Sequence, residues 1–199
     1  KLRFPGHLGL NFIFLKLPLV NLLNFRYTFI HRFLQMGGKK MNIVLNNPLE
    51  TEAIAKIIGQ KAQAGDVIVL TGDLGAGKTT MTKGIALGLG ISQMIKSPTY
   101  TIIREYPQGR LPLYHMDVYR VEEGADELGL DEYFEGDGLS VVEWGSLIEE
   151  ELPEDYLEII LNKDSQEADK RVLEFRGTGP LAEERIAEIL QVWEAREYD

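Results

Sequence analysis

Residues 72–79 form the string GDLGAGKT, which fits the pattern G-x-x-x-x-G-K-[ST]. An apolar run at 66–70 precedes the string and a helix-like stretch at 80–89 follows it, so the pattern predicts a loop that leads from a strand into the N-terminus of a helix. The glycines at 72, 75 and 77 would let the backbone turn tightly and bring amide N–H groups against phosphate oxygens, where the helix dipole adds positive potential. The string therefore predicts an α/β fold with a nucleotide-binding P-loop.

The chemistry expected of this loop is divided between two side chains and a set of backbone amides. Lys78 would reach the β- and γ-phosphates of a nucleotide, and the Thr79 hydroxyl would bind Mg²⁺. The other nucleotide-contacting residues expected in this segment are Asp73, Leu74, Gly75, Ala76, Gly77 and Thr80.

From Met41 onward, strand-like and helix-like segments alternate. Composition and apolar periodicity predict strands at 42–45, 66–70, 100–106, 113–119, 139–144, 156–162 and 171–177. Helices are expected at 48–63, 80–89, 122–134, 146–151 and 181–197. A turn at 107–109 indicates that the strands on either side of it pair antiparallel. This order predicts a single α/β domain of the P-loop NTPase type, with a mixed sheet flanked by helices and the ligand at the carboxyl ends of the strands.

Two of the expected strands end in an acidic residue, Asp117 and Glu143. Either carboxylate could bind Mg²⁺ directly or through water, or orient an attacking water; a solvated acid at a strand end is the alternative interpretation. His115 lies two residues before Asp117 and is expected on the same face of the strand, with a structural role favoured over a catalytic one. Trp144 could stack on a base or fill the core.

A hydroxyl-rich string, SPTY at 97–100, lies between the expected P-loop helix and the next strand. Nucleotide hydrolases often keep a switch segment that senses the γ-phosphate at this place. A plain proline turn explains the same residues.

The distribution of charge separates the first forty residues from the rest of the chain. The 199 residues include 21 Lys and Arg against 31 Asp and Glu, a net charge of −10. No acidic residue precedes Glu50, whereas seven of the basic residues do, which leaves 31 acids against 14 bases from there on. A body this acidic is a poor candidate for binding RNA or DNA by itself, because phosphate-backbone binding usually leaves a basic footprint.

Residues 1–40 are expected to be an extension outside the fold, non-native or disordered, and residues 41–199 the P-loop domain. The extension is rich in Leu and Phe, but charged residues interrupt it before it reaches a membrane-spanning length, and it lacks the order of a signal peptide. An upstream-translated or artificially added segment is the favoured interpretation; an organelle-targeting or membrane-surface segment is the alternative. The chain contains no cysteine, which excludes disulfides and thiolate metal sites.

Four strings in this order closely resemble the TsaE (YjeE) family: 72–80 (GDLGAGKTT), 97–100 (SPTY), 114–120 (YHMDVYR) and 142–144 (VEW). The resemblance extends over about 41–199. Two departures are the first forty residues, which have no counterpart in the family, and Gly145, which stands where a proline is common after Glu-Trp.

The resemblance implies a cytoplasmic, Mg²⁺-dependent ATPase that supports formation of N6-threonylcarbamoyladenosine at position 37 of tRNAs. In that family the protein binds a complex of the transferase TsaD and its partner TsaB, and ATP hydrolysis supports repeated turnover. The tRNA is thus contacted through partners, and no membrane is involved. This agrees with the acidic composition.

Site residues carry over from the resemblance by matching position. Lys78 and the loop amides would hold the phosphates, and Thr79 and Glu143 would bind Mg²⁺. Asp117 matches an essential acid whose role stays open between water positioning and an outer-shell metal contact. Thr51 matches a position near the adenine, and Arg171 matches a C-terminal basic position near the nucleotide. Trp144, in the last of the four strings, is also expected to contact the nucleotide.

Three other functions are weighed against this one. A GTPase would need N-K-x-D, but 162–165 has serine in the last position, and the D-x-x-G at 126–129 lies in a helix-like acidic stretch. A small-molecule kinase would need a cluster of arginines to clamp two phosphorylated substrates, whereas Arg104, Arg110 and Arg120 are scattered. A nucleotide-sensing scaffold would bind the nucleotide without turnover.

Overall fold

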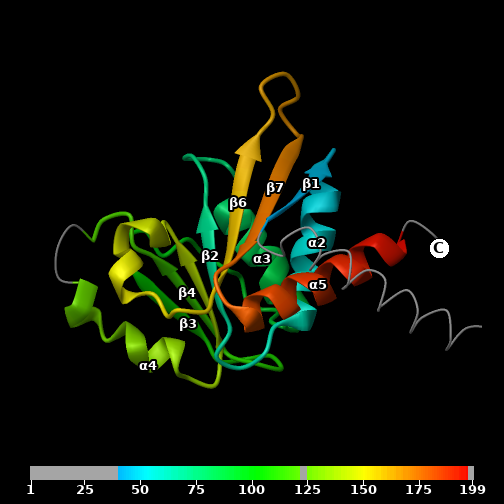
Figure 1. The fold of residues 1–199 in the computed structure, drawn as a ribbon. Coiled ribbons are helices and arrows are strands. Elements are labelled where there is room, and N and C mark those ends of the chain that lie inside the picture. Colours follow the sequence, from blue (N-terminus) through cyan, green and yellow to red (C-terminus); the bar gives the residue numbers. More distant parts are fainter. Residues whose placement is uncertain (1–39, 122–124, 197–199) are drawn as a thin grey trace, which may run out of the picture.

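The structure, a computed structural model, describes residues 40–121 and 125–196, and its strands form one sheet (Figure 1). The strands are β1 (Met41–Leu45), β2 (Val67–Thr71), β3 (Ile103–Tyr106), β4 (Leu113–Asp117), β5 (Leu139–Glu143), β6 (Leu157–Lys163) and β7 (Arg171–Gly177). The strand order is β1-β7-β6-β2-β5-β4-β3. The central pairs β6–β2, β2–β5 and β5–β4 are parallel, and the outer pairs are antiparallel. The expected mixed sheet and the antiparallel pairing of β3 with β4 are both confirmed.

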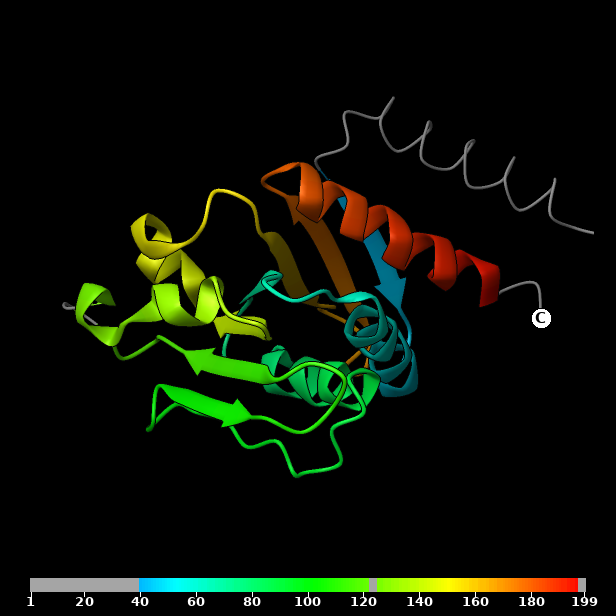
Figure 2. The ribbon, with the colours of Figure 1, turned by 90° about the horizontal axis from the view of Figure 1, so that it is seen from below.

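Helices cover both faces of this sheet unequally (Figure 2). On one face lie α2 (Pro48–Lys61), α3 (Lys78–Gly88) and α5 (Pro180–Ala195). On the other, near β4 and β5, lie α4 (Leu130–Phe134) and two 3₁₀ helices, η1 (Ala125–Leu128) and η2 (Gly145–Glu151). Among the described residues, no helix combines the length and the apolar character needed to cross a bilayer. Residues 1–39 of the expected extension lie outside the described part of the chain.

Alternation along the strands divides the apolar side chains between two cores. In β5, Leu139 and Val141 belong to the larger core beneath α2, α3 and α5, whereas Val142 belongs to the smaller core beneath α4. Glu143 continues the alternation of Leu139 and Val141, so its side chain emerges on the face that α3 covers. This places an acid beside the helix that follows the P-loop.

Three expected elements differ from those observed. The helix expected at 122–134 is wrong over its described residues: η1 and α4 are separate, because Gly129 takes a left-handed φ of 63° between them; residues 122–124 lie outside the described part. The strand expected from Tyr100 begins only at Ile103, since the N–H groups of Thr101 and Ile102 donate to the Pro98 carbonyl in a turn. The helix expected at 146–151 is a 3₁₀ helix, η2, with non-helical angles at Ile148.

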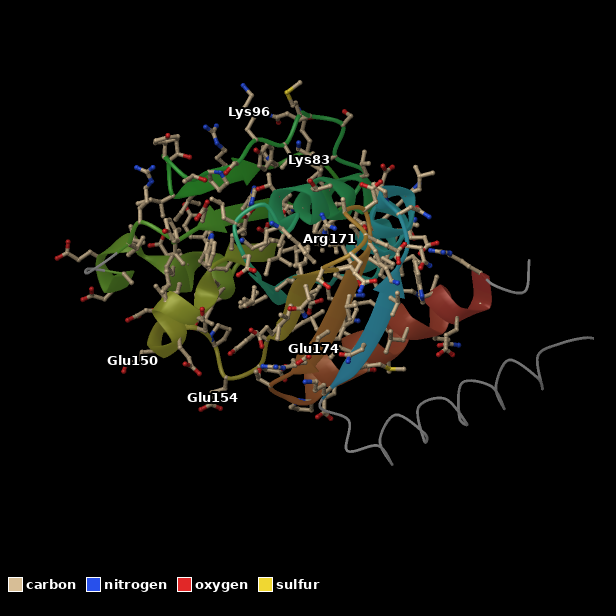
Figure 3. The ribbon with its side chains drawn as sticks, turned by 90° about the horizontal axis from the view of Figure 1, so that it is seen from above. Lys83, Lys96, Glu150, Glu154, Arg171 and Glu174 are labelled. Atoms are coloured by element: carbon tan, nitrogen blue, oxygen red, sulfur yellow. The ribbon has the colours of Figure 1, made fainter. Side chains whose placement is uncertain are left out.

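The half of the sheet formed by β6, β7 and β1 carries charges on the face opposite α5. Arg176 bonds Glu174 at 2.5 Å and Glu158 at 3.4 Å, and Lys40 contacts Glu174 at 2.8 Å. Figure 3 shows Glu174 among the sticks of this face. These contacts pair the carboxylate of Glu174, which is only 9% exposed, with two cations.

Glycines bring the backbones of α2 and α3 into direct contact. A Cβ added at Gly59 would lie 2.0 Å from the carbonyl oxygen of Ile85, and one at Gly88 would lie 2.2 Å from that of Lys56. Real Cβ atoms never approach so closely, so only glycine fits at either crossing point. Because α3 starts at the P-loop, this contact also fixes the position of the loop.

We expect Gly59→Ala to lower the free energy of unfolding by about 1–3 kcal/mol, as overpacking does. Helix propensity alone would favour alanine by about 1 kcal/mol, so a net loss would show that the steric clash dominates. The measurement is urea denaturation followed by circular dichroism. Leu87→Ala, on the exposed side of α3, is the control and should change stability by less than about 0.5 kcal/mol. An unchanged urea midpoint for Gly59→Ala would contradict the close contact.

Candidate nucleotide-binding site

A cavity of about 340 Å³ opens where β2, β5 and β4 end. The P-loop and the first turn of α3 form one wall. The facing wall consists of Ser97, Thr99, Asp117, Tyr119, Glu143 and Trp144. The carboxyl ends of parallel strands are the usual place for a ligand in such a sheet, so this cavity is the candidate site.

The P-loop has the backbone that its glycines were expected to provide. Gly72, Gly75 and Gly77 have φ of 147°, 72° and 113°, all in the region that favours glycine. A Cβ at Gly72 would also lie 2.5 Å from the carbonyl oxygen of Leu161 in β6. The turn delivers the chain directly into α3, whose first residue is Lys78, so the N-terminus of that helix borders the cavity.

Lys78 is buried, with 5% of its surface exposed, and its ammonium is satisfied by neutral groups. Its Nζ donates to the carbonyl oxygens of Gly72 at 2.7 Å and Asp73 at 3.2 Å. The same Nζ lies 3.8 Å from the centre of the Trp144 ring, a cation–π contact. Burial lowers the pKa of Lys78 from its ordinary value, while the charges of Glu143, Asp117 and Asp73 oppose that shift. A phosphate would give this ammonium a direct anionic partner.

The two strand-end acids lie next to each other, because Asp117 is paired with Glu143 in the parallel ladder of β4 and β5. Both are buried, 4% and 3% exposed. The Oε1 atom of Glu143 accepts hydrogen bonds from the Thr79 hydroxyl at 2.9 Å and from Nε2 of His115 at 2.8 Å. These bonds compensate the burial of the carboxylate and bring the acid of β5 against the first turn of α3.

Asp117 is tied to the hydroxyl-rich segment rather than to the P-loop. Its Oδ2 accepts from the Thr99 hydroxyl at 2.6 Å, and its Oδ1 accepts from the backbone N–H of Tyr119 at 3.1 Å. The hydroxyls of Ser97 and Thr99 are 2.6 Å apart. Since Thr99 gives its proton to Asp117, Ser97 must donate to Thr99. A chain of hydrogen bonds thus joins the 97–100 segment to the strand-end acid.

The ring of Trp144 covers the ammonium of Lys78. Trp144 has a left-handed φ of 67°, uncommon for a residue with a side chain and costing about 1–3 kcal/mol. Its backbone N–H donates to the Leu70 carbonyl at 3.2 Å, and its ring lies 5.0 Å from that of Tyr119. From the sequence, Trp144 was expected either to stack on a base or to fill the core. Its place on the cavity wall is compatible with stacking on a ligand, and its contact with Tyr119 shows that it also packs on protein.

Residues 45–173 match the family model described as "Threonylcarbamoyl adenosine biosynthesis protein TsaE". The chain belongs to the TsaE family. This confirms the resemblance drawn from the four sequence strings.

Individual TsaE proteins support the same assignment. The tRNA threonylcarbamoyladenosine biosynthesis protein TsaE of Bacillus subtilis is 56% identical over 133 residues, 67% of this chain and 83% of that protein. The TsaE protein of Treponema pallidum is 45% identical over 116 residues, 57% of this chain and 85% of that protein. The crystal structure of Bacillus subtilis YdiB superposes with a TM-score of 0.69 and 46% identity over 81% of this chain and 97% of that one.

Not all residues expected to contact the nucleotide line the cavity in this TsaE protein. Leu74, Gly75, Gly77, Lys78, Thr79 and Thr80 do, together with Asp117, Glu143 and Trp144. The Asp73 carbonyl instead accepts from Lys78 and from the Ala76 N–H, and Ala76 is buried in the larger core. Asp73 and Ala76 therefore stabilise the conformation of the loop without lining the cavity.

Thr51 and Arg171 also lie outside the lining. Thr51 is buried in α2, where its hydroxyl donates to the Asn47 carbonyl at 3.4 Å. Arg171, at the start of β7, donates through Nε to the Ala76 carbonyl at 3.0 Å and through Nη1 to two carbonyls of its own hairpin. Figure 3 shows Arg171 beside α3. As placed here, Arg171 supports the P-loop.

Two residues of the site were missed as candidates. Tyr119 lines the cavity beside Trp144, and its position two residues after a strand-end acid was the available signal. Lys163 donates to the Leu74 carbonyl at 2.8 Å, although the sequence pointed to it only as part of an imperfect guanine-binding string.

The site's oxygen donors suit Mg²⁺. Within the described residues, no group of three or more His, Cys, Asp and Glu could hold a metal ion by itself. The hydroxyl of Thr79 and the carboxylate of Glu143 lie 2.9 Å apart at the mouth of a P-loop. Mg²⁺ commonly takes one or two protein oxygens and completes its octahedron with phosphates and water, and this pair fits that requirement.

Proposed function

We propose that this TsaE protein is a Mg²⁺-dependent ATPase that supports formation of N6-threonylcarbamoyladenosine at position 37 of tRNAs by binding the TsaD–TsaB transferase complex. The observation that carries the ATPase proposal is the meeting of Lys78, Thr79, Asp117 and Glu143 at one cavity. The family description and the names of the relatives support the place in tRNA modification. Such an activity belongs in the cytoplasm, where tRNA is modified.

In this proposal Lys78 exchanges its carbonyl partners for phosphate oxygens. The N-terminus of α3 and the loop amides would hold the same phosphates by hydrogen bonds and by the helix dipole. Mg²⁺, when bound, would neutralise charge that develops on the phosphates. Thr79 and Glu143 would hold it, and His115, bonded to Glu143, would keep that carboxylate oriented.

Asp117 is the remaining acid and the candidate for activating water. Thr99 and the Tyr119 amide hold its carboxylate in one orientation. Preorganisation of this kind is what positioning a nucleophile requires. An outer-shell contact to the metal is the other role consistent with the same geometry.

The partner proposal rests on the resemblance to the TsaE family, and the charge of the chain agrees with it. From Glu50 onward the chain has 31 acids and 14 bases, so a direct grip on tRNA is disfavoured. A transferase complex that holds the tRNA itself removes that difficulty.

Two other functions remain as alternatives. A small-molecule kinase would bind the same nucleotide but needs a cationic site for a second substrate. A nucleotide-sensing scaffold would bind ATP without turning it over.

Lys78→Ala should weaken MgATP binding by about 100-fold or more, because it removes a buried charge that would bond two phosphates. Isothermal titration calorimetry measures this directly. Lys83→Ala is the matched control, since Lys83 lies on the exposed side of the same helix (Figure 3), and its affinity should match the wild type. Equal affinities for the two variants would exclude the P-loop as the binding site.

Glu143→Ala should abolish the rise of ATP turnover with Mg²⁺ concentration, because one of two protein ligands is lost. The assay is phosphate release over a Mg²⁺ titration, with thermal unfolding as the check on folding. Glu150→Ala, an exposed acid on η2 (Figure 3), should keep the wild-type Mg²⁺ dependence. Retained Mg²⁺-dependent turnover in Glu143→Ala would refute the ligand assignment.

The proposed function is tested by ATP hydrolysis of the full chain, alone and with TsaB and TsaD, with modified tRNA scored in the same samples. We expect slow hydrolysis alone, and faster hydrolysis with sustained tRNA modification when the partners are present. ATP hydrolysis at the same rate with and without TsaB and TsaD would favour a kinase. Binding without hydrolysis in any mixture would favour the scaffold.

A further inference from the structure

The hairpin between β6 and β7 brings a second lysine to the P-loop. β6 runs parallel beside β2, so both strands end at the same edge of the sheet and Lys163, the last residue of β6, lies beside the loop that follows β2. Its Nζ donates to the Leu74 carbonyl at 2.8 Å and lies 3.5 Å from where a Cβ of Gly75 would be. Leu74 and Gly75 both line the cavity. The ammonium of Lys163 is therefore at the rim of the candidate site.

The charge of Lys163 is uncompensated there. Within residues 40–121 and 125–196, no carboxylate forms an ion pair with it, and its only hydrogen-bond partner is the neutral Leu74 carbonyl. By contrast, Lys170 at the other end of the same hairpin pairs with Glu167 at 2.9 Å. Lys78 donates to the carbonyls of Gly72 and Asp73 in the same loop. Two ammonium groups of like charge thus contact one loop, where they repel each other.

We propose that Lys163 is a second phosphate-binding cation of this site. When ATP binds, the ammonium of Lys163 exchanges the Leu74 carbonyl for the terminal phosphate. The inference rests on the proposed ATPase function and adds a residue to it. A charged phosphate oxygen is a stronger acceptor than a neutral carbonyl, and an anion between the two lysines would relieve their repulsion. The flexible four-carbon stem of an exposed lysine permits the exchange of partners.

The terminal phosphate is the expected target because of where Lys163 acts. Lys78 is the P-loop lysine, whose place is at the β- and γ-phosphates, and Lys163 donates to the Leu74 carbonyl, which follows the Asp73 carbonyl that accepts from Lys78. A cation supplied from the same chain at this end of the triphosphate resembles the arginine that some nucleotide hydrolases provide in cis. Lys163 should therefore distinguish ATP from ADP.

A purely structural role makes a different prediction. If Lys163 only held the Leu74 carbonyl, its loss would loosen the whole loop and weaken ATP and ADP binding alike. If Lys163 contacts the terminal phosphate, its loss weakens ATP binding much more than ADP binding. The ratio of the two affinities separates the roles.

The experiment compares the full chain carrying Lys163→Gln with Lys170→Gln, which removes the same charge from the same hairpin. Dissociation constants for MgATP and MgADP are measured by calorimetry at one salt concentration. We expect Lys163→Gln to weaken ATP binding by about tenfold, the worth of one charged hydrogen bond, and ADP binding by less than about threefold. Lys170→Gln should change neither constant, and Lys163→Arg should restore the preference for ATP.

Three results would overturn the inference. Equal weakening for ATP and ADP in Lys163→Gln would assign the residue to loop support, and unchanged constants would assign it no role. In both cases the wild-type protein still binds nucleotide, so the proposed ATPase function stands. Failure of the wild-type chain to bind either nucleotide would overturn that function together with this inference.

Discussion

The parallel pairing of β2, β5 and β4 is the constraint on which the site depends. In this register Leu70 is opposite Glu143, and Glu143 is opposite Asp117. As a result, β2, which precedes the P-loop, ends at the same edge of the sheet as β4 and β5, which end in acids. A shift of one residue in either ladder would turn the carboxylates to the other face of the sheet. The buried side chains that alternate along β5 fix that register through the two cores, and the packing of α2 on α3 holds the P-loop helix over it.

Electrostatics at this edge are balanced without direct ion pairs between the lysines and the acids. Glu143 is held by a hydroxyl and an imidazole, and Asp117 by a hydroxyl and a backbone amide. The lysine of the P-loop is held by carbonyls and a ring face. Buried charges cost little only when their hydrogen bonds are satisfied. Each group here is held by hydrogen-bond partners from the protein, and the carbonyl partners of Lys78 could be replaced by an incoming anion.

Local sequence signals predicted the parts of the site that depend on one segment. The P-loop was predicted because the string follows an apolar strand and opens a helix, and the acids because each ends a strand. What could not be predicted depends on contacts between distant segments. The hydrogen bond from Thr99 to Asp117 needs the turn at Pro98–Ile102, whose left-handed Ile102 has no sequence signature. The break at Gly129 was missed because the helical pattern of its neighbours continues through it.

The position of Lys163 shows the same limit most clearly. In the sequence, Lys163 was part of an imperfect guanine-binding string and served only as evidence against GTP. Such a string describes a residue's neighbours in the chain and not its neighbours in space. Lys163 lies 89 residues after Leu74 in the sequence. The two residues are in contact because β6 pairs with β2 in the sheet. That topology concentrates Lys78, Lys163 and Arg171 around one loop in a domain that is otherwise acidic. Because a field of one sign repels like-charged ligands over about a Debye length, these local cations would favour a polyphosphate at this loop in a chain whose net charge is −10.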